Sequence, residues 1–418
     1  MVNLLSENQV KQKITQGLEA LPLRGKRVLV IIPDITRTMP LPLFFHTIMA
    51  VLQGYARQVD FLVALGTHPS LSEAELLRLV GLTAAEKAAH YSQVHFFNHT
   101  WQDPAMLTQV GVISQAQVEQ ISRGLLHQSI PVRLNRLILD YDHLLVCGPV
   151  FPHEVVGFSG GNKYFFPGIA GQDIIDLSHW MGALLTSYEI IGTKNTGVRQ
   201  LIDLAASLIP RPRSALCCVV TPEGVAGVFC GCPEEAWSQA ADLSAQVHIQ
   251  WVDRPYPTVL SVMPALYTEI WTGAKGMYKV EPVVTDGGEV IIYAPHIGEF
   301  SVVHGSYIRE IGYHVRDFFL KQPGKFDHIP ACVRAHSTHL RGLGTYDPVT
   351  GVESPRIRVT LSTGIPEADC RAVNLGYRDP ASIDVEEWTK HQDEHLLVVP
   401  RAGETLYRIK PGQQPICS

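Results

Sequence analysis

The sequence predicts an α/β fold: two α/β domains with mainly parallel sheets and an active site in the crevice between them. Apolar runs such as the one within Lys26–Pro33 are continuous, which is typical of strands buried on both faces of a parallel sheet. Helix-like patterns alternate with these runs, as expected when helices connect parallel strands. A chain of 418 residues also exceeds one ordinary hydrophobic core, so two domains are expected.

The first domain is expected to span residues 1–265. It opens with an amphipathic helix pattern and continues with alternating strand and helix patterns. The predicted order is helix 6–21, strand 26–33, helix 41–55, strand 59–65, helix 72–80, a third buried run at 136–146, helices 171–185 and 197–209, and strand 215–220.

The second domain is expected to span residues 266–418. The proline-containing stretch Asp253–Pro257 precedes it and resembles a domain edge. The predicted elements are strand 258–263, helix 267–283, a glycine turn and strand 289–293. This order again indicates an α/β unit.

Composition excludes several classes of protein. The formal net charge of -6, without runs of lysine and arginine, argues against a nucleic-acid-binding or acidic-membrane-binding surface. No apolar stretch approaches the roughly 20 residues that span a bilayer, and the N-terminus shows no secretory signal pattern. The eight cysteines therefore suggest reduced thiols in a cytoplasmic protein. Cys217–Cys218 and Cys230–Cys232 are too tightly spaced and too isolated to favour a zinc site.

Polar residues follow each of the first three predicted strands. In open parallel sheets, ligands bind at the carboxyl ends of the strands, so these residues are expected to converge. They are Asp34, Thr36 and Arg37 after the first strand, Gly66, Thr67 and His68 after the second, and His153 with Lys163 after the third. Plainer explanations remain open for single residues: Asp34 could cap a helix with Arg37 as a surface partner, and His68 could be an ordinary loop histidine.

The segment Pro152–Gly168 is the most informative part of the chain. It contains His153, a Gly160–Gly161 bend and Lys163, and His179 follows it. Glycines allow close approach to a ligand, and a lysine in such a bend can bind phosphate or serve as a covalent anchor. The segment does not match the P-loop pattern, and Gly-x-Gly-x-x-Gly is missing, so neither a nucleotide triphosphatase nor an ordinary dinucleotide site is expected.

At these residues the chain resembles the lactate racemase family, whose members use a nickel-pincer nucleotide. The family's Asp-x-Thr-Arg, Gly-Thr-His and His–Gly-Gly–Lys–Pro-Gly motifs match in order, followed by a histidine and a second-domain motif of lysine, Glu-Pro-Val-Val and Gly-Gly. The matching residues are Asp34, Thr36, Arg37, Gly66, Thr67, His68, His153, Lys163, Pro167, Gly168, His179, Lys275, Gly276, Glu281–Val284, Gly287 and Gly288.

The resemblance implies how the cofactor would be held. Lys163 would carry the pyridinium ring through a thioamide, and His179 would bind the nickel. Asp34 and Thr36 would help to hold the nucleotide. Further contacts to the phosphate or ribose would come from the backbone of Gly160 and Gly161.

It also implies a racemase or epimerase that inverts C2 of a 2-hydroxy acid by hydride transfer to and from the cofactor. His68 and His153 would be the two acid/base groups, one for each configuration, since imidazole titrates near neutral pH. Arg37 and Lys275 would orient the substrate carboxylate. The expected partners are the small 2-hydroxy acid and the proteins that make the cofactor; the oligomeric state stays open.

Departures from the family pattern bear on the substrate. Trp271 and Thr272 replace the Tyr-Gln that lactate enzymes commonly have before the lysine matched by Lys275. His296 is expected to contact the substrate. Additional histidines in the second domain could lie at the surface or behind the site: His304, His336 and His339. Together these residues favour a larger or polyhydroxylated acid, such as a sugar acid.

Two alternatives remain. One is a nicotinamide- or metal-dependent oxidoreductase of similar fold, which would carry no covalent adduct. The other is a catalytically inactive nickel-cofactor-binding protein. Such a carrier would need Lys163 and His179, whereas His68 and His153 together indicate catalysis.

Overall fold

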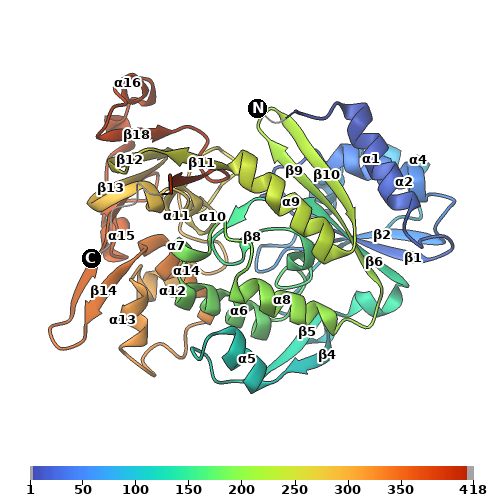
Figure 1. Ribbon diagram of the computed structural model, residues 1–418, viewed down its shortest axis with the longest axis horizontal. Coiled ribbons are helices and arrows are strands. Elements are labelled where there is room, and N and C mark those ends of the chain that lie inside the picture. Colours follow the sequence, from blue (N-terminus) through green and yellow to red (C-terminus); the bar gives the residue numbers. More distant parts are fainter. Residues whose placement is uncertain (1–2, 412–418) are drawn as a thin grey trace. The chain divides into compact units, whose positions relative to one another are not determined.

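Two mainly parallel β-sheets organise the chain, and Figure 1 shows them with the helices that connect their strands. The structure is a computed structural model that describes residues 3–411. The α/β class and the mainly parallel sheets predicted from the sequence are confirmed. None of the helices within the described range combines the length and apolar character needed to cross a membrane.

The chain forms two units that are interleaved in sequence. The first contains residues 1–151, 158–178 and 194–247, and the second contains residues 152–157, 179–193 and 248–418. We expected a single boundary near residue 265, but the chain enters the second unit at residues 152, 179 and 248. His153 and His179 therefore belong to the second unit, while Lys163 belongs to the first.

The first unit is built on a six-stranded sheet in which only the edge strand β10 runs antiparallel to its neighbour. In sheet order its strands are β10 (Gly224–Gly231), β9 (Arg213–Thr221), β6 (His143–Pro149), β1 (Arg27–Ile32), β2 (Gln58–Val63) and β3 (Phe96–Asn98). The other elements are α1 (Glu7–Glu19), α2 (Leu41–Leu52), α3 (Glu73–Leu79), α4 (Ala84–His90), α5 (Gln115–Ile121), α8 (Gly197–Ser207), α9 (Pro233–His248) and the β4–β5 hairpin (Leu107–Ile113 and Ile130–Asn135).

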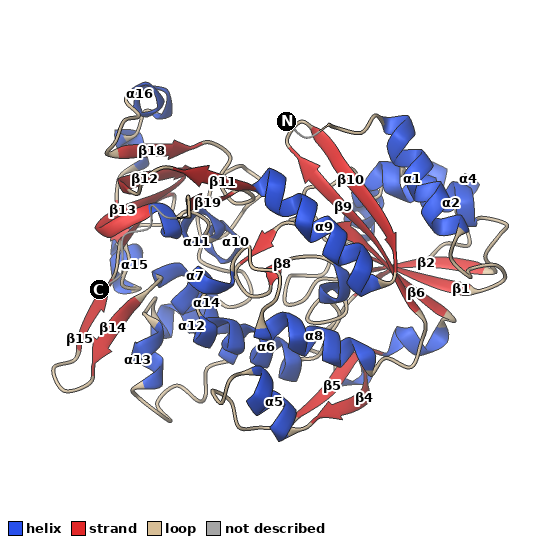
Figure 2. Cartoon of the chain, in the orientation of Figure 1, coloured by secondary structure: helices blue, strands red, loops and turns tan. Residues whose placement is uncertain are grey.

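The second unit contains a five-stranded parallel sheet. In order its strands are β17 (Gly376–Tyr377), β16 (Arg358–Thr363), β13 (Val284–Ala294), β12 (Tyr256–Val262) and β18 (Leu396–Val399). The remaining elements are α7 (Ser187–Ile190), α10 (Ile270–Gly273), α11 (Lys275–Tyr278), α12 (Gly305–Ile311), α13 (Arg316–Leu320), α14 (Ala331–Arg341), α15 (Glu367–Ala372), α16 (Val385–Lys390), and the pairs β11–β19 (Ile249–Val252, Leu406–Ile409) and β14–β15 (Gly344–Asp347, Val352–Pro355). Figure 2 distinguishes these helices and strands by colour.

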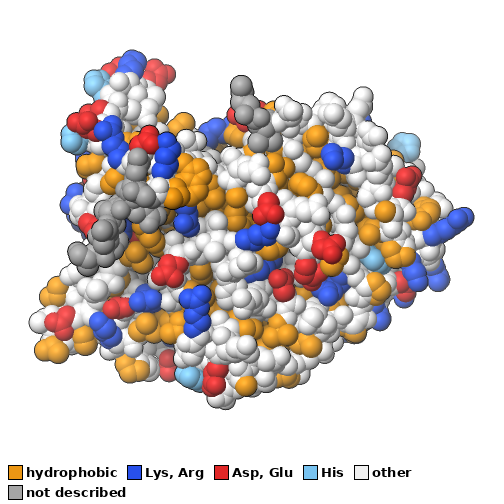
Figure 3. All heavy atoms as spheres, in the orientation of Figure 1, with side chains coloured by type: hydrophobic (Ala, Val, Ile, Leu, Met, Phe, Trp, Pro, Cys, Tyr) orange, Lys and Arg blue, Asp and Glu red, His pale blue; other side chains and the backbone are white. Residues whose placement is uncertain are grey.

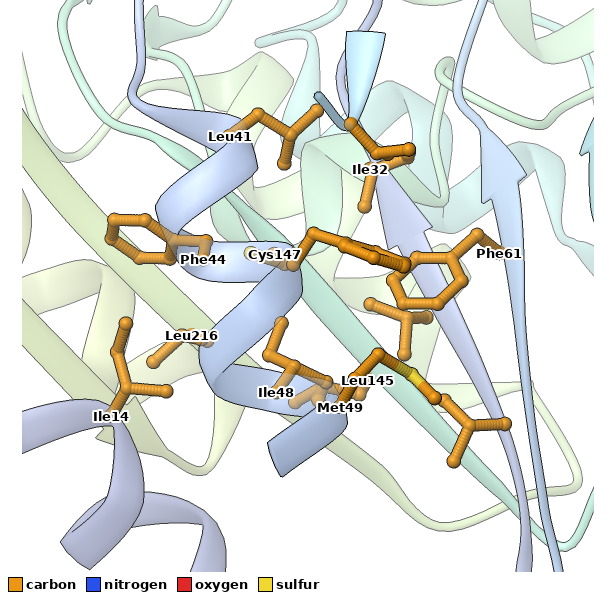
Figure 4. Close-up of a cluster of buried hydrophobic side chains, with 14 of the residues drawn as sticks. Ile14, Ile32, Leu41, Phe44, Ile48, Met49, Phe61, Leu145, Cys147 and Leu216 are labelled. Carbon is orange, nitrogen blue, oxygen red and sulfur yellow. The ribbon is translucent and has the colours of Figure 1, made fainter. Parts of the chain in front are cut away.

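Apolar side chains from α1 and α2 cover one face of the first unit's sheet. Figure 4 shows Phe44, Ile48 and Met49 of α2 packed over Ile32 and other strand residues. Each of the three α2 side chains is at most 3% exposed. Burying such a side chain stabilises the fold by about 1.5–3 kcal/mol. The core thus holds β1 and β2 in place below the loops that follow them.

Three predicted elements differ from the structure. The glycine turn expected before strand 289–293 lies within β13, which already begins at Val284. The run 136–146 is a strand only from His143 onward, because residues 136–140 form a short 3-10 helix (Arg136–Asp140). The predicted helix 267–283 is broken into α10, α11 and a 3-10 turn (Glu281–Val283). Glycines weaken a helix and proline removes a backbone donor, so Gly273, Gly276 and Pro282 account for the breaks.

Acidic and basic side chains are intermixed over the face of the molecule drawn in Figure 3.

Inside the first unit, one histidine is buried and hydrogen-bonded on both ring nitrogens. His99 is 1% exposed; its Nε2 lies 2.9 Å from the carbonyl oxygen of Ala170, and its Nδ1 lies 3.2 Å from the side-chain nitrogen of Asn135. Nδ1 therefore accepts and Nε2 donates, as in a neutral ring.

The stability of the protein is expected to fall as the pH drops from about 6.5 towards 4. Burial lowers the pKa of His99 to about 4, although the bond to Ala170 offsets part of the effect. The unfolded chain therefore binds a proton in this window before the folded protein does. Between about pH 7 and pH 5, His99 should account for about 2 kcal/mol of lost stability.

Urea unfolding of wild-type protein and His99→Gln at these two pH values tests this. The glutamine variant should lose less stability between them, whatever its stability at neutral pH. His395→Gln is the control, because the side chain of His395 is 73% exposed. Equal pH dependence in wild-type protein and His99→Gln would contradict the assignment.

Candidate active site

The first unit brings Asp34 and His68 together at the carboxyl ends of two neighbouring strands. β1 and β2 are parallel and in register, with Ile32 opposite Val63, so the loops after them start side by side. Nδ1 of His68 hydrogen-bonds to Oδ2 of Asp34. Because an ionised carboxylate only accepts, His68 donates its Nδ1 proton and keeps the Nε2 lone pair available in the neutral ring.

The second oxygen of Asp34 is also engaged. The backbone N–H and the hydroxyl of Thr36 both donate to Oδ1, at 3.1 and 2.7 Å, and Arg37 donates to the Thr36 hydroxyl at 3.3 Å. Burial alone would raise the pKa of the Asp34 carboxyl, but His68, Arg37 and Thr36 together hold it well below its usual value. Asp34 is therefore a carboxylate throughout the physiological pH range.

The structure excludes the helix-cap explanation for Asp34. α2 begins at Leu41 with Pro40 before it, so Asp34 caps no helix there. Asp34 and Arg37 instead line a cavity of about 460 Å³, to which Arg78 also contributes. Arg37 additionally lies over the ring of Phe151, with its guanidinium carbon 5.6 Å from the ring centroid.

The loop that carries Lys163 is attached to the loop that carries His68. The N–H of Gly66 donates to the carbonyl of Gly168 at 2.9 Å. Lys163 itself lies in a 3-10 turn, Gly161–Tyr164, and is partly exposed. Three predicted site segments of the first unit, around Asp34, His68 and Lys163, are thus connected through direct contacts.

Gly160 and Gly161 are required by conformation and by packing. Both have positive φ, +81° and +58°, which side chains other than glycine rarely adopt. A Cβ on Gly160 would lie 2.5 Å from Cγ2 of Val150, and one on Gly161 would lie 2.8 Å from Cβ of Trp237. The backbone of Gly161 also hydrogen-bonds to Cys217. Contacts from these glycines to a cofactor remain a prediction.

In the second unit, His153 has a carboxylate beside it. Oε2 of Glu154 lies 3.3 Å from Nδ1 of His153, and their side chains are 15% and 5% exposed. The N–H of Val155 also donates to Nδ1 at 3.2 Å. Val155 can pair with Nδ1 when the ring is neutral, and Glu154 can accept the Nδ1 proton when the ring is charged.

His179 lies in the second unit among other histidines. It is partly exposed on α6 (Gln172–Leu185), the helix in which the chain passes from the first unit to the second. Burial lowers the pKa of His339 to about 4, which Glu154 opposes and His179 reinforces. Burial also holds the pKa of His336 well below its usual value, with further lowering by His339, His304 and His179. His336 and His339 are therefore neutral, and both are close enough to His179 to interact with it electrostatically.

Trp271 and Lys275 are held by aromatic contacts. The ring of Trp271 lies 4.2 Å from that of His336 and 4.5 Å from that of His304, measured between centroids. Nζ of Lys275 lies 4.6 Å from the centroid of Tyr267, and Lys275 is only 4% exposed. These contacts fix the orientation of both side chains.

The other two residues expected at the substrate differ in their surroundings. Thr272 is 5% exposed, and its hydroxyl donates to the carbonyl of Glu269 at 3.2 Å. His296 is exposed, and its Nε2 lies 3.0 Å from the carbonyl oxygen of Tyr267. Substrate contacts from either residue remain a prediction.

Sequence reasoning missed the carboxylates paired with the two histidines. The resemblance places Asp34 at the nucleotide and implies no role for Glu154. A signal for the first pair existed, because an acid and a histidine that follow adjacent parallel strands lie at one sheet edge. Within residues 3–411, no three His, Cys, Asp or Glu side chains are grouped as a metal ion would require, so those side chains alone supply no complete ligand set.

Comparisons with known proteins show which sequences and folds this chain resembles. Residues 7–190 match the lactate racemase N-terminal domain family. A lactate racemase from Thermoanaerobacterium thermosaccharolyticum is 24% identical over 305 residues, which cover 70% of this chain and 66% of that enzyme. The chain thus aligns with slightly less than two thirds of that relative's length.

Solved structures extend the likeness to nearly the whole chain. A crystal structure of a protein from Thermotoga maritima is 33% identical, with a TM-score of 0.90, over 98% of this chain and 100% of that one. The lactate racemase apoprotein from Thermoanaerobacterium thermosaccharolyticum shares the fold, with a TM-score of 0.71 at 20% identity over 96% and 93% of the two chains. Residues 7–190 thus match the N-terminal domain family of lactate racemases, one lactate racemase is similar in sequence, and the chain shares the fold of the lactate racemase apoprotein.

Proposed function

We propose that the protein is an isomerase that inverts C2 of a 2-hydroxy acid with a nickel-pincer nucleotide tethered to Lys163. One observation carries the proposal: each of the two expected proton-transfer histidines has a carboxylate at its Nδ1. Asp34 accepts a hydrogen bond from Nδ1 of His68, and Oε2 of Glu154 lies 3.3 Å from Nδ1 of His153, within ion-pair distance of the charged ring. A carboxylate in this position orients the ring and stabilises the imidazolium that forms when the histidine takes up a proton.

Two histidines suit an isomerase because the substrate hydroxyl points in different directions in the two configurations. In each direction one imidazole removes the hydroxyl proton and the other returns a proton to the product. An enzyme that acts on only one configuration of the acid would need only one histidine with its carboxylate. Arg37 and Lys275 are the cations we assign to the substrate carboxylate, since a guanidinium or ammonium near the acid orients it.

The residues present fit the family's cofactor. Lys163 is partly exposed in the turn Gly161–Tyr164, as expected of a side chain that carries an attached group. His179 is partly exposed and close to neutral histidines, which suits an imidazole ligand for nickel. Lys163 would hold the nucleotide covalently and His179 would bind the metal. When bound, this cofactor supplies a hydride acceptor and donor, while the chain supplies position and proton transfer.

For the substrate we propose a 2-hydroxy acid larger than lactate, with further hydroxyl groups. Support comes from the second unit, where the short side chain of Thr272 leaves more room than a glutamine would. Trp271 is fixed by His304 and His336. The neutral imidazole of His336 offers both a donor and an acceptor, the combination that binds hydroxyl groups.

Exchange of the C2 configuration tests the proposal. Protein made together with the cofactor-synthesis proteins is incubated with pure isomers of lactate, longer 2-hydroxy acids and aldonic acids. We expect the opposite C2 isomer to appear by NMR, fastest with an aldonic acid, together with an added mass on intact chain that maps to Lys163. Turnover without any adduct would indicate a nicotinamide- or metal-dependent oxidoreductase instead. An adduct without turnover on the whole panel would indicate an inactive cofactor-binding protein.

A further inference from the structure

The backbone before Lys163 is fixed at three consecutive carbonyl groups. Two of them accept hydrogen bonds from Arg199: its Nη2 lies 2.5 Å from the oxygen of Phe158 and its Nη1 lies 3.4 Å from that of Gly160. The carbonyl between them, on Ser159, accepts from Nε1 of Trp237 at 2.8 Å. Two side chains distant in sequence thus hold every peptide of this short stretch.

Arg199 and Trp237 also pack on each other. The guanidinium carbon of Arg199 lies 4.0 Å from the centroid of the Trp237 ring, and the two residues are 3% and 6% exposed. Stacking a desolvated guanidinium on an indole is favourable, because the cation interacts with the electron-rich face of the ring. Contact and hydrogen bonds therefore act together, and we call this pair the Arg199–Trp237 clamp.

Burying a guanidinium costs desolvation free energy. The hydrogen bonds of Arg199 described above go to backbone carbonyl groups. Burial lowers the pKa of Arg199 to about 10, with partial compensation from Asp203. An apolar residue could fill the same space on α8 without the desolvation cost. What an apolar residue could not do is hold two carbonyls in a fixed geometry, which the planar donor fork of arginine does.

The rest of the loop is fixed from the same side. Asn162 is 1% exposed, and its side-chain nitrogen donates to Asp203 at 3.0 Å and to Glu234 at 2.7 Å. Gly161 lies against Trp237 so closely that it has no room for a Cβ. Lys163 therefore extends from a backbone fixed on either side of the Gly160–Gly161 bend.

We propose that Arg199 and Trp237 are positioning residues for cofactor attachment at Lys163. The clamp fixes the loop so that the Lys163 amine is presented in one geometry, and loss of either donor loosens it. The role as an attachment device rests on the proposed function, whereas the fixing of the loop does not.

The chain without cofactor provides the first test. Trp237→Phe removes one N–H donor and keeps a ring, Arg199→Lys keeps the charge without the fork, and Arg199→Met removes both. Arg211→Met is the matched control, because Arg211 also donates to a backbone carbonyl, that of Leu139 at 2.7 Å. The rate of Lys163 acylation by acetic anhydride, followed by peptide mass spectrometry, is expected to rise by about threefold or more in the clamp variants as the loop opens locally.

Lys11 and Lys390, whose side chains are 47% and 65% exposed, serve as internal references that should react at unchanged rates. Circular dichroism and thermal melting verify folding. If Arg199→Met does not fold, the acylation rates of the milder variants Arg199→Lys and Trp237→Phe test the clamp instead. A general loss of structure would raise the reactivity of many lysines, whereas loss of the clamp changes Lys163 selectively.

Cofactor attachment provides the second test. In cells that make the cofactor, the fraction of chains with the Lys163 adduct is expected to fall about tenfold in Trp237→Phe and Arg199→Lys, as misplacing a reacting group does. Arg211→Met should load like wild-type protein. Folded clamp variants with wild-type acylation and wild-type loading would overturn the inference. A wild-type chain that carries no adduct would count against the proposed function, and the acylation result would still decide the clamp.

Discussion

Replacing Lys163 by alanine is expected to abolish both cofactor attachment and C2 isomerisation. A covalent tether needs a nucleophile at that point of the loop, and alanine does not supply one. Lys163 is partly exposed, and the hydrogen bonds described above that fix its loop come from other residues. Intact-mass spectrometry and NMR of the isomer mixture measure the two losses.

Two companion variants make the result specific. Lys163→Arg keeps the positive charge but not the amine, and it should fail in the same way if the lysine is a tether. Lys194→Ala should load and turn over normally, since Lys194 forms an ion pair with Asp242 at 2.7 Å. Activity in Lys163→Arg would mean that charge, and not a covalent bond, is what this position supplies.

Removing the imidazole of His68 is expected to slow isomerisation by about 10²–10⁴-fold, the usual contribution of a positioned acid/base group. Asp34→Asn should slow it by about tenfold or more, because an amide does not favour the Nδ1–H tautomer that leaves Nε2 free to accept. Turnover per loaded chain is the measurement for both, with loading read from intact mass. His395→Ala, at an exposed side chain, is the control.

The fraction of Asp34→Asn chains that carry the cofactor distinguishes two roles of Asp34: acting through His68 and holding the nucleotide. If the carboxylate acts through His68, as the hydrogen bond between them indicates, Asp34→Asn keeps the adduct and loses turnover. If Asp34 mainly holds the nucleotide, as the family resemblance implies, the adduct is lost as well. Wild-type turnover in both His68→Ala and Asp34→Asn would defeat the assignment of this pair to proton transfer.

Sequence patterns predicted the order of strands and helices well wherever the signal is local. The opening helix is an example, since Ser6 and Gln9 form the capping box that begins α1. The pattern failed at 267–283, where apolar residues continued through glycines and a proline that break the helix. The spacing of apolar residues indicates which positions are buried. It does not show whether the helix is continuous, because a broken helix can be buried to the same extent.

The site shows the same division. Residues at strand ends, such as Asp34 and His68, were identifiable because parallel topology brings them to one edge. The sequence analysis does not predict a role for Arg199, although this arginine falls among the buried apolar positions of an amphipathic helix pattern. Its partners are two carbonyl groups and an indole ring, and no side-chain pattern encodes contacts with the backbone of a distant loop. Interleaving of the two units was missed for the same reason.

The interleaved chain has a consequence for the order of synthesis. Domains tend to fold as their sequence emerges, from the N-terminus onward. The clamp around the Lys163 loop is available once Trp237 has been made. The segment after His179 must wait much longer, because the carbonyl of Ile191 is bound by Arg408, which is 217 residues further along. During translation, the contacts around the lysine expected to anchor the cofactor can therefore form early. The contacts of the segment after the histidine expected to bind its metal can form only much later.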